Sequence, residues 1–126
     1  MPKHVPPTPS APGALGPYSF ATEAHGLVFI SGQVPLDPST GERAADDIES
    51  QAHQVMKNIG VLLADVDLGY EDILKTTIFM TDMADYPKIN EVYGSYFESE
   101  PPARSAIQAA ALPAGFNIEI EVIAAR

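Results

Sequence analysis

The 126-residue chain has 7 basic and 17 acidic residues, a net charge of −10, 45% hydrophobic residues and no cysteine. This length and hydrophobic content are typical of one domain with a single core. The negative charge argues against binding to nucleic acid or to an anionic membrane, because both need a basic protein surface. The absence of cysteine excludes disulfides, thiol nucleophiles and cysteine-ligated zinc, and it fits a cytoplasmic protein.

The search for cofactor motifs finds none. The histidines His4, His25 and His53 are scattered without the spacing of metal ligands, so we expect no metal site. The chain has no glycine-rich phosphate loop, no dinucleotide-binding glycine pattern and no nucleophile elbow. No apolar run reaches the roughly 18 residues that a transmembrane helix needs, and no signal peptide is visible. We therefore expect no cofactor and no membrane partner.

Residues 1–15 form a proline-rich N-terminal segment. Proline fixes φ and lacks a backbone N–H, so this segment cannot form a helix and at most lies along a surface. The chain shows no internal repeat and no second zone of composition. We therefore expect a single domain spanning residues 1–126.

The rest of the chain predicts five strands and two helices in the order ββαβαββ. In chain order these are strands over 18–23 and 27–33, a helix from near 47 to before 69, a strand over 73–82, a helix from about 86 to 100, and strands over 104–111 and 117–125. Asp46 and Glu49 are predicted to cap the first helix and Asp85 the second. This order is typical of an α+β fold, in which a mixed sheet carries both helices on one face.

The other face of the predicted sheet is partly apolar. The alternation of side chains along the strands assigns to it Phe29, Phe79, Ala106, Ala110 and Ile123. Two helices can cover only one face, so the second would be a large exposed apolar patch. We infer a subunit interface on this face. The alternative is that the proline-rich N-terminal segment covers it.

Arg104 is the most informative single residue. It follows Pro101-Pro102-Ala103 at the start of a predicted strand, in a chain with few cations. A guanidinium offers a rigid fork of donors that matches a carboxylate with two hydrogen bonds. Arg104 therefore either holds a small anionic substrate or forms a structural ion pair with Glu119 or Glu121.

The alternation also places Arg104, Glu119 and Ser31 at the edge of the second face. An arginine, a carboxylate and a hydroxyl near a subunit interface could form a small polar cleft. The alternative for Ser31 is a strand residue beside a bulge at Gly32.

Two further polar residues are candidates for the same cleft. Asn90 lies on the buried stripe of the second helix together with Tyr86 and Tyr93, and its amide needs a partner there. It belongs either to the cleft or to a bond with a backbone carbonyl. Tyr18 follows the stiff turn Gly16-Pro17, which would fix its hydroxyl; the alternative is a core tyrosine with its tip in water.

Several spaced motifs resemble one known family, the Rid family (RidA, formerly YjgF) of reactive-intermediate imine deaminases. The motifs, in this order, are Gly16-Pro17-Tyr18, Ile30-Ser31-Gly32-Gln33, the helix with Asn90, Pro102-Ala103-Arg104-Ser105 and Ile118-Glu119-Ile120-Glu121. The resemblance covers the chain from about Pro12 to Arg126. It implies a chorismate-mutase-like α+β fold and a homotrimer with three clefts between subunits.

The resemblance also implies a function. Family members are hydrolases of the 2-iminobutanoate/2-iminopropanoate deaminase type. They convert enamines and imines such as 2-aminoacrylate to 2-keto acids and ammonia, without metal or cofactor. Two alternatives belong to other classes. One is a non-catalytic trimer that senses 2-keto acids, and the other is the ribonuclease or translation inhibitor for which some relatives are named. The net charge of −10 disfavours the latter.

Site residues follow from the resemblance position by position. Arg104 matches the arginine that holds the substrate carboxylate, and Glu119 matches the acidic residue beside the attacking water. Tyr18 completes the implied catalytic set and also lines the pocket.

The implied substrate-binding residues are Arg104, Ser31, Gly32 and Asn90. Ser31 and Asn90 match residues that line the family's pocket, and Gly32 lies where backbone could approach the ligand. The chain departs from many close members at Ala106, where they carry a cysteine two residues after the arginine.

Overall fold

The computed structural model describes residues 2–14 and 16–126, so positions 1 and 15 of the predicted proline-rich segment lie outside it. The strands and helices of the described chain are β1 (Ala21–Ala24), β2 (Leu27–Gln33), α1 (Ile48–Asp65), β3 (Ile73–Met80), α2 (Tyr86–Gly94), β4 (Ala103–Gln108) and β5 (Ile118–Ala125). Short 3-10 turns lie at Tyr70–Asp72, Met83–Asp85 and Pro113–Gly115. The predicted order ββαβαββ is confirmed.

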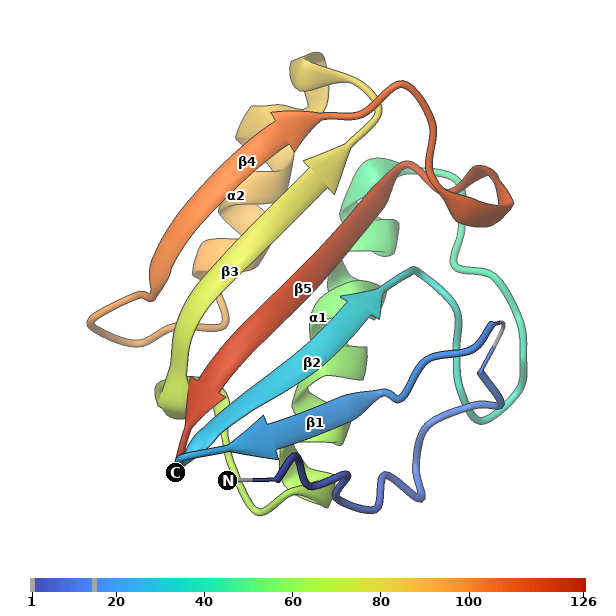
Figure 1. Ribbon diagram of the computed structural model, residues 1–126. Coiled ribbons are helices and arrows are strands. Elements are labelled where there is room, and N and C mark those ends of the chain that lie inside the picture. The colour runs from blue at the N-terminus through green and yellow to red at the C-terminus, as the bar shows by residue number, and fades with distance from the viewer. Residues whose placement is uncertain (1, 15) are drawn as a thin grey trace.

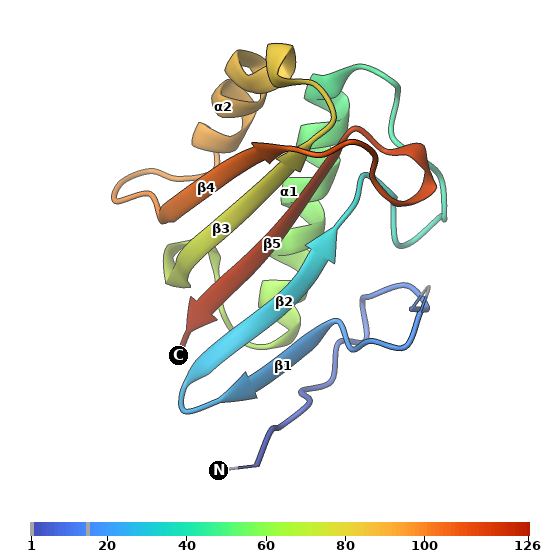
Figure 2. The ribbon, with the colours of Figure 1, turned by 45° about the horizontal axis from the view of Figure 1, so that its top comes forward.

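The strands form one mixed sheet in the order β1-β2-β5-β3-β4. The pairs β1–β2, β2–β5 and β5–β3 are antiparallel, whereas β3 and β4 are parallel. Both helices lie on one face of this sheet, and the opposite face carries no helix (Figures 1 and 2). The predicted α+β architecture with two helices on one face is therefore confirmed.

The core lies between the sheet and the helices. Alternate strand residues point into it, as the period of two requires, and helical spacing presents one stripe of α1 to them. Fully buried examples are Val28, Ile78, Ile118 and Ile120 from the sheet and Val55, Met56, Ile59 and Leu63 from α1. Each buried methylene contributes about 0.8 kcal/mol to folding, so this layer fixes which face of the sheet is left for function.

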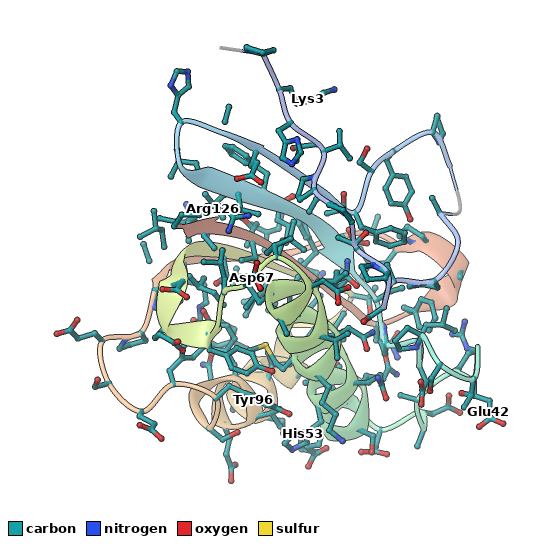
Figure 3. All side chains as sticks on the ribbon, turned by 90° about the horizontal axis from the view of Figure 1, so that it is seen from below. Lys3, Glu42, His53, Asp67, Tyr96 and Arg126 are labelled. Carbon is teal, nitrogen blue, oxygen red and sulfur yellow. The ribbon has the colours of Figure 1, made fainter. Side chains whose placement is uncertain are left out.

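Two polar contacts hold the helices in place. Thr76 is buried in β3, and its hydroxyl lies 2.7 Å from the hydroxyl of Tyr93 in α2. Just beyond the end of α2, the Tyr96 hydroxyl lies 2.9 Å from Nδ1 of His53 in α1. Figure 3 shows these two side chains next to each other on the outer side of the helices. These bonds fix the distance of α2 from the sheet and from α1.

The helix caps differ from the prediction. Asp47 caps α1, since its carboxylate accepts a hydrogen bond from the Ser50 amide at 2.9 Å. Asp85 precedes α2 but makes no capping bond with its side chain. The reason is that the Met83–Asp85 turn runs directly into α2, so Asp85 has helical dihedral angles instead of the extended backbone of a cap.

The N-terminal segment runs around the edge of the sheet and does not bury the open face. His4 pairs with Glu23 of β1 through two backbone hydrogen bonds of 2.9 and 2.8 Å. Further on, the Ser10 hydroxyl donates to the Asp65 carboxylate at the end of α1. On the open face Phe29 remains 44% exposed with this segment in place. The alternative in which the proline-rich segment covers that face is therefore wrong.

β1 begins at Ala21 and not at the predicted Tyr18, because residues 16–18 form a turn in which the Tyr18 amide donates to the Gly16 carbonyl. Tyr18 therefore stands just before the strand. None of the described helices combines the length and the apolar character needed to cross a membrane.

The helix–sheet core is expected to dominate stability. Leu63→Ala removes a fully buried side chain of α1 and should lower the free energy of unfolding by about 2–5 kcal/mol. Leu74→Ala makes the same chemical change at an exposed position of β3 and should cost well under half as much. Urea denaturation of both variants at one protein concentration measures the difference. Equal losses would contradict the assignment of the core.

Candidate functional site

Arg104 lies on the helix-covered face of the sheet. β4 is an edge strand, and its parallel pairing with β3 sets Arg104 opposite the buried Thr76. The guanidinium Nη2 donates a hydrogen bond of 2.8 Å to the hydroxyl of Tyr86 in α2. The prediction that Arg104 shares the open face with Glu119 is therefore wrong. Ala106 was misplaced for the same reason, since it lies opposite the buried Ile78.

Arg104 has no carboxylate partner in the described chain. The ion pairs found there join Glu23 to His4 and to Arg126. The structural ion pair of Arg104 with Glu119 or Glu121 is therefore contradicted.

Aromatic rings hold the Arg104 guanidinium. Its central carbon lies 5.1 Å from the centre of the Tyr93 ring and 5.5 Å from that of Tyr86. Ring faces attract a cation without consuming its N–H donors. Most of these donors are therefore left for an anionic ligand.

Arg104 borders a hollow between α2 and the start of β4. The hollow has a volume of about 350 Å³, and its lining residues are Asn90, Tyr93, Gly94, Phe97, Pro101, Pro102 and Arg104. The side-chain oxygen Oδ1 of Asn90 is buried, and within residues 2–14 and 16–126 nothing donates a hydrogen bond to it. Buried polar atoms in folded proteins nearly always have a partner. The Arg104 guanidinium favours an anionic ligand in this hollow, whereas the unpaired Asn90 oxygen is an acceptor and needs an N–H or O–H donor.

Glu119 lies on the opposite, open face. In β5 it pairs with Phe79, one position out of phase with the buried Ile118 and Ile120. Its carboxylate passes directly over Gly32, where any Cβ would collide with it. The β2–β5 register shifts between Ile30 and Gln33, so Ser31 and Gly32 form an irregularity that accommodates the carboxylate.

The environment of Glu119 suits a group that exchanges protons. Burial raises the pKa of the Glu119 carboxyl, and the negative charge of Glu121 raises that pKa further. Both effects raise this pKa because they disfavour the ionised form of the Glu119 carboxyl. A carboxyl with a raised pKa both takes and returns a proton more readily near neutral pH.

Ser31 and Tyr18 lie on the β2 side of the open face. The Ser31 hydroxyl donates to the Ser19 carbonyl at 2.6 Å, and its amide donates to the Phe20 carbonyl at 2.9 Å. These bonds hold the segment before β1 against β2. Tyr18 is 45% exposed and packs edge-on against Phe20, with ring centres 5.6 Å apart. The alternative of a core tyrosine at position 18 is therefore wrong.

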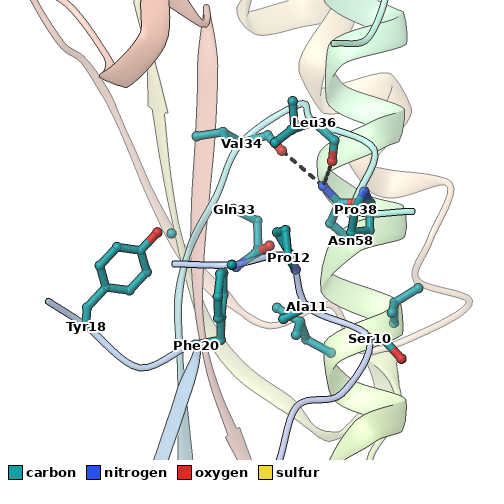
Figure 4. Close-up of a pocket in the computed structure, with 14 residues that line it drawn as sticks. Ser10, Ala11, Pro12, Tyr18, Phe20, Gln33, Val34, Leu36, Pro38 and Asn58 are labelled. Carbon is teal, nitrogen blue, oxygen red and sulfur yellow. Dashed lines mark hydrogen bonds between the residues drawn. The ribbon is translucent and has the colours of Figure 1, made fainter. Parts of the chain in front are cut away.

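Tyr18 and Ser31 line a shallow hollow of about 380 Å³ on the open face, together with Thr77 and Glu121. A smaller cavity of about 50 Å³ lies behind Gly32, beneath the N-terminal segment (Figure 4). The Asn58 amide of that cavity already donates to the carbonyls of Val34 and Leu36. The hollow on the open face is therefore the better candidate for polar chemistry.

The predicted site residues thus form two groups on opposite faces of one sheet. Arg104 and Asn90 lie between β4 and α2, whereas Tyr18, Ser31, Gly32 and Glu119 lie on or beside the open face. A single chain does not bring the two groups together. Tyr86 and Tyr93, the partners of Arg104, were predicted only as part of the buried stripe of the second helix; their helical spacing carried no signal of a role beyond packing.

The chain is similar to known proteins over nearly its whole length. A protein-family model described as endoribonuclease L-PSP matches residues 8–126. The chain is 44% identical over 117 residues to the mouse 2-iminobutanoate/2-iminopropanoate deaminase, with 93% of this chain and 87% of that protein covered. It is 48% identical over 122 residues to the chloroplastic Reactive Intermediate Deaminase A of Arabidopsis thaliana, covering 97% of this chain and 65% of that protein.

Solved structures agree with the sequences. A Rid family protein of Yersinia pestis superposes with a TM-score of 0.94 at 43% identity and covers 99% of this chain and 100% of its own. E. coli TdcF, solved with bound serine, superposes with a TM-score of 0.91 at 40% identity and covers 98% of both chains. The mixed sheet with two helices on one face is the chorismate-mutase-like fold of these proteins. The chain belongs to the Rid family.

Proposed function

We propose that the protein hydrolyses small 2-imino acids and their enamine tautomers to 2-keto acids and ammonia. The observation that carries this proposal is Arg104, a guanidinium that borders a hollow and has no carboxylate partner in the described chain. A small substrate carboxylate supplies that partner. Relatives named as deaminases of reactive intermediates or of 2-iminobutanoate and 2-iminopropanoate, at 43–48% identity, support the same chemistry.

The proposal includes a homotrimer in which each site lies between two subunits. Arg104 and Glu119 lie on opposite faces of one sheet, so they can meet only across a contact between copies. The strand that carries Arg104 is an edge strand with an exposed Ile107, and the open face exposes Phe29. Packing this edge against the open face of the next copy buries both, and repeating a head-to-tail contact closes a ring. The number three comes from the resemblance to the family.

The proposed mechanism uses few groups. An enamine first tautomerises to the imine. Arg104 binds the carboxylate through two hydrogen bonds and thereby orients the imine carbon. Water adds to the carbon of the protonated imine while Glu119 of the partner subunit accepts the water's proton, giving a neutral tetrahedral amino alcohol. Glu119 returns this proton to the amine. The C–N bond then breaks as the C=O bond forms, the hydroxyl proton passes to Glu119, and ammonia leaves. Tyr18, with its exposed hydroxyl, orients the water or the departing nitrogen.

The proposal also covers the setting of the reaction. The net charge of −10 supports a protein without a nucleic-acid partner, even though the matching family model is described as an endoribonuclease. The absence of cysteine supports a cytoplasmic location. The ligands are small anionic imines and the 2-keto acids that they yield.

A coupled assay tests the proposed function. A threonine dehydratase or an amino-acid oxidase generates different imines, and keto-acid formation is compared with and without the protein. Acceleration above spontaneous hydrolysis is expected. Isothermal titration with 2-oxobutyrate runs alongside, and binding without acceleration would favour a sensor of 2-keto acids over an enzyme.

Arg104 is expected to control activity without controlling folding. Its bidentate contact is worth about 3–5 kcal/mol in a desolvated site. Arg104→Ala should therefore lower kcat/KM by roughly two to four orders of magnitude. Arg104→Lys keeps the charge but loses the fork, and it should still lose most activity. Circular dichroism and sedimentation should show an unchanged fold and assembly. A folded Arg104→Ala trimer with nearly wild-type rates would end the carboxylate-binding role.

Glu119 is expected to give the pH–rate profile its acid limb. Because burial raises its pKa, the proton-accepting form should be lost as pH falls through a value above the usual range of a carboxyl. Glu119→Gln should remove this limb and lower kcat more than it weakens 2-oxobutyrate binding, whereas Tyr18→Phe should have a smaller effect on kcat. A raised folded-state pKa also means that the ionised carboxyl destabilises the fold, so Glu119→Gln should raise Tm at pH 7. Wild-type kcat in Glu119→Gln would remove Glu119 from the chemistry.

Mixed trimers test whether the site is shared between subunits. Arg104→Ala and Glu119→Gln chains are unfolded in urea, mixed one to one and refolded together. Random mixing makes about three quarters of the rings mixed, and in each mixed ring one interface of the three combines an intact Arg104 with an intact Glu119. About one quarter of wild-type activity should therefore be restored. Wild-type protein refolded alone gives the reference, and sedimentation confirms the trimer. Activity no higher than that of either variant refolded alone would place both residues in one subunit's site.

A further inference from the structure

Tyr86 is the residue that the sequence assigned to packing and the structure places against Arg104. It opens α2, and its ring is half-buried against the core. Its hydroxyl accepts a 2.8 Å hydrogen bond from Arg104 Nη2. Within the described chain the guanidinium makes no other hydrogen bond. A phenylalanine would pack equally well at this position, so the hydroxyl adds one thing, the bond to Arg104.

The chemistry of the guanidinium gives this bond a consequence. A guanidinium can bind a carboxylate through either of two parallel pairs of N–H groups, one formed by Nη1 and Nη2 and the other by Nε and Nη2. Each hydrogen of Nη2 serves one of these pairs. Because Tyr86 takes one hydrogen of Nη2, one pair is occupied and the other remains complete for a ligand.

The plane of the guanidinium is held by a second contact. Tyr93 lies under it, with the Arg104 central carbon 5.1 Å from the ring centre. Tyr93 is itself anchored, since its hydroxyl lies 2.7 Å from that of the buried Thr76. The rings therefore limit the tilt of the guanidinium, and the Tyr86 hydroxyl limits its rotation within the plane.

We propose that Tyr86 is a positioning residue for imino-acid hydrolysis, whose hydroxyl holds the Arg104 guanidinium so that a single pair of N–H donors faces the substrate carboxylate. The inference rests on the proposed function. Tyr86 acts through Arg104 and does not itself bind the substrate. Without its hydroxyl the guanidinium has to give up rotational freedom when the carboxylate binds, so binding weakens equally in the ground and transition states.

The measured quantities are the Kd of 2-oxobutyrate by isothermal titration and the steady-state constants for imine hydrolysis. Tyr86→Phe should raise both Kd and KM about tenfold and change kcat less than about twofold, because the fixed arginine binds the carboxylate equally in the ground and transition states. The Tm should stay close to that of the wild type, since the ring and its packing remain.

Tyr96→Phe is the matched control. It also removes one hydroxyl from a half-buried tyrosine near α2, but that hydroxyl bonds His53 on the outer side of the helices (Figure 3). It should leave Kd, KM and kcat at their wild-type values. A similar rise of Kd in Tyr96→Phe would assign the effect to general loosening of α2 and overturn the positioning role.

A double-mutant cycle separates positioning from packing. Arg104→Lys lacks the two donor pairs that Tyr86 is proposed to select, so adding Tyr86→Phe to it should weaken 2-oxobutyrate binding less than twofold further. Additive losses would mean a structural role for Tyr86. Tighter binding in Tyr86→Phe would mean that the hydroxyl holds Arg104 away from the ligand. Either result overturns the inference.

The two proposals fail in different ways. Suppose that the wild-type protein binds 2-oxobutyrate and that Tyr86 and Arg104 show the expected coupling in this binding, but that imine hydrolysis is not accelerated. The proposed function is then overturned, and the role of Tyr86 in carboxylate binding stands. Wild-type protein that is active, with Tyr86→Phe unchanged, overturns the role of Tyr86 alone. Absence of both binding and turnover overturns both.

Discussion

The parallel pairing of β4 with β3 is the constraint on which the site depends. It sets Arg104 opposite Thr76, and so turns the guanidinium toward α2 and away from the open face. A shift of one residue in this register would exchange the two faces of β4 and expose the arginine. The pairing also leaves the other side of β4 unpaired, because β4 is the last strand of the sheet. The same strand therefore carries both Arg104 and a free edge, the two features on which the proposed shared site depends.

The second half of the site depends on a close approach between two strands. Glu119 can lie over β2 only because Gly32 has no side chain, and the irregular β2–β5 register at Ser31 and Gly32 provides the space. The resulting burial raises the pKa of the Glu119 carboxyl. Backbone geometry thus controls the chemistry of this carboxylate, although no side chain of β2 forms a bond to it in the described chain. Each half of the proposed site is built by a local feature of one strand pair, and a single chain keeps the two halves on opposite faces of the sheet.

The sequence predicts the order and approximate position of the elements because the alternation in the strands and the helical stripe are local patterns. The candidate site residues come from motifs that are short and keep their order, and the roles of these residues stay predictions. The sequence does not predict which face Arg104 occupies, because that face is set by the register with β3, a distant partner. The prediction of a helix cap at Asp85 was wrong for a related reason, since the preceding turn merges with α2. The sequence does not reveal the proposed role of Tyr86, because an aromatic residue on a buried helical stripe normally belongs to the core.

The acidic composition and the Arg104 guanidinium both bear on the recognition of the anionic substrate of the proposed reaction. A protein of net charge −10 repels an anionic imine at long range, but at physiological ionic strength this repulsion is screened beyond about 8 Å. Recognition then depends on what the substrate meets at contact distance. A guanidinium paired with a carboxylate of its own chain would have to exchange that partner for the ligand. Arg104 contacts aromatic rings and a neutral hydroxyl instead, so no carboxylate in the described part of the chain competes with a ligand for it. Since imines already react with water unaided, orientation by such an arginine and one proton-accepting carboxylate is sufficient chemistry for the proposed reaction.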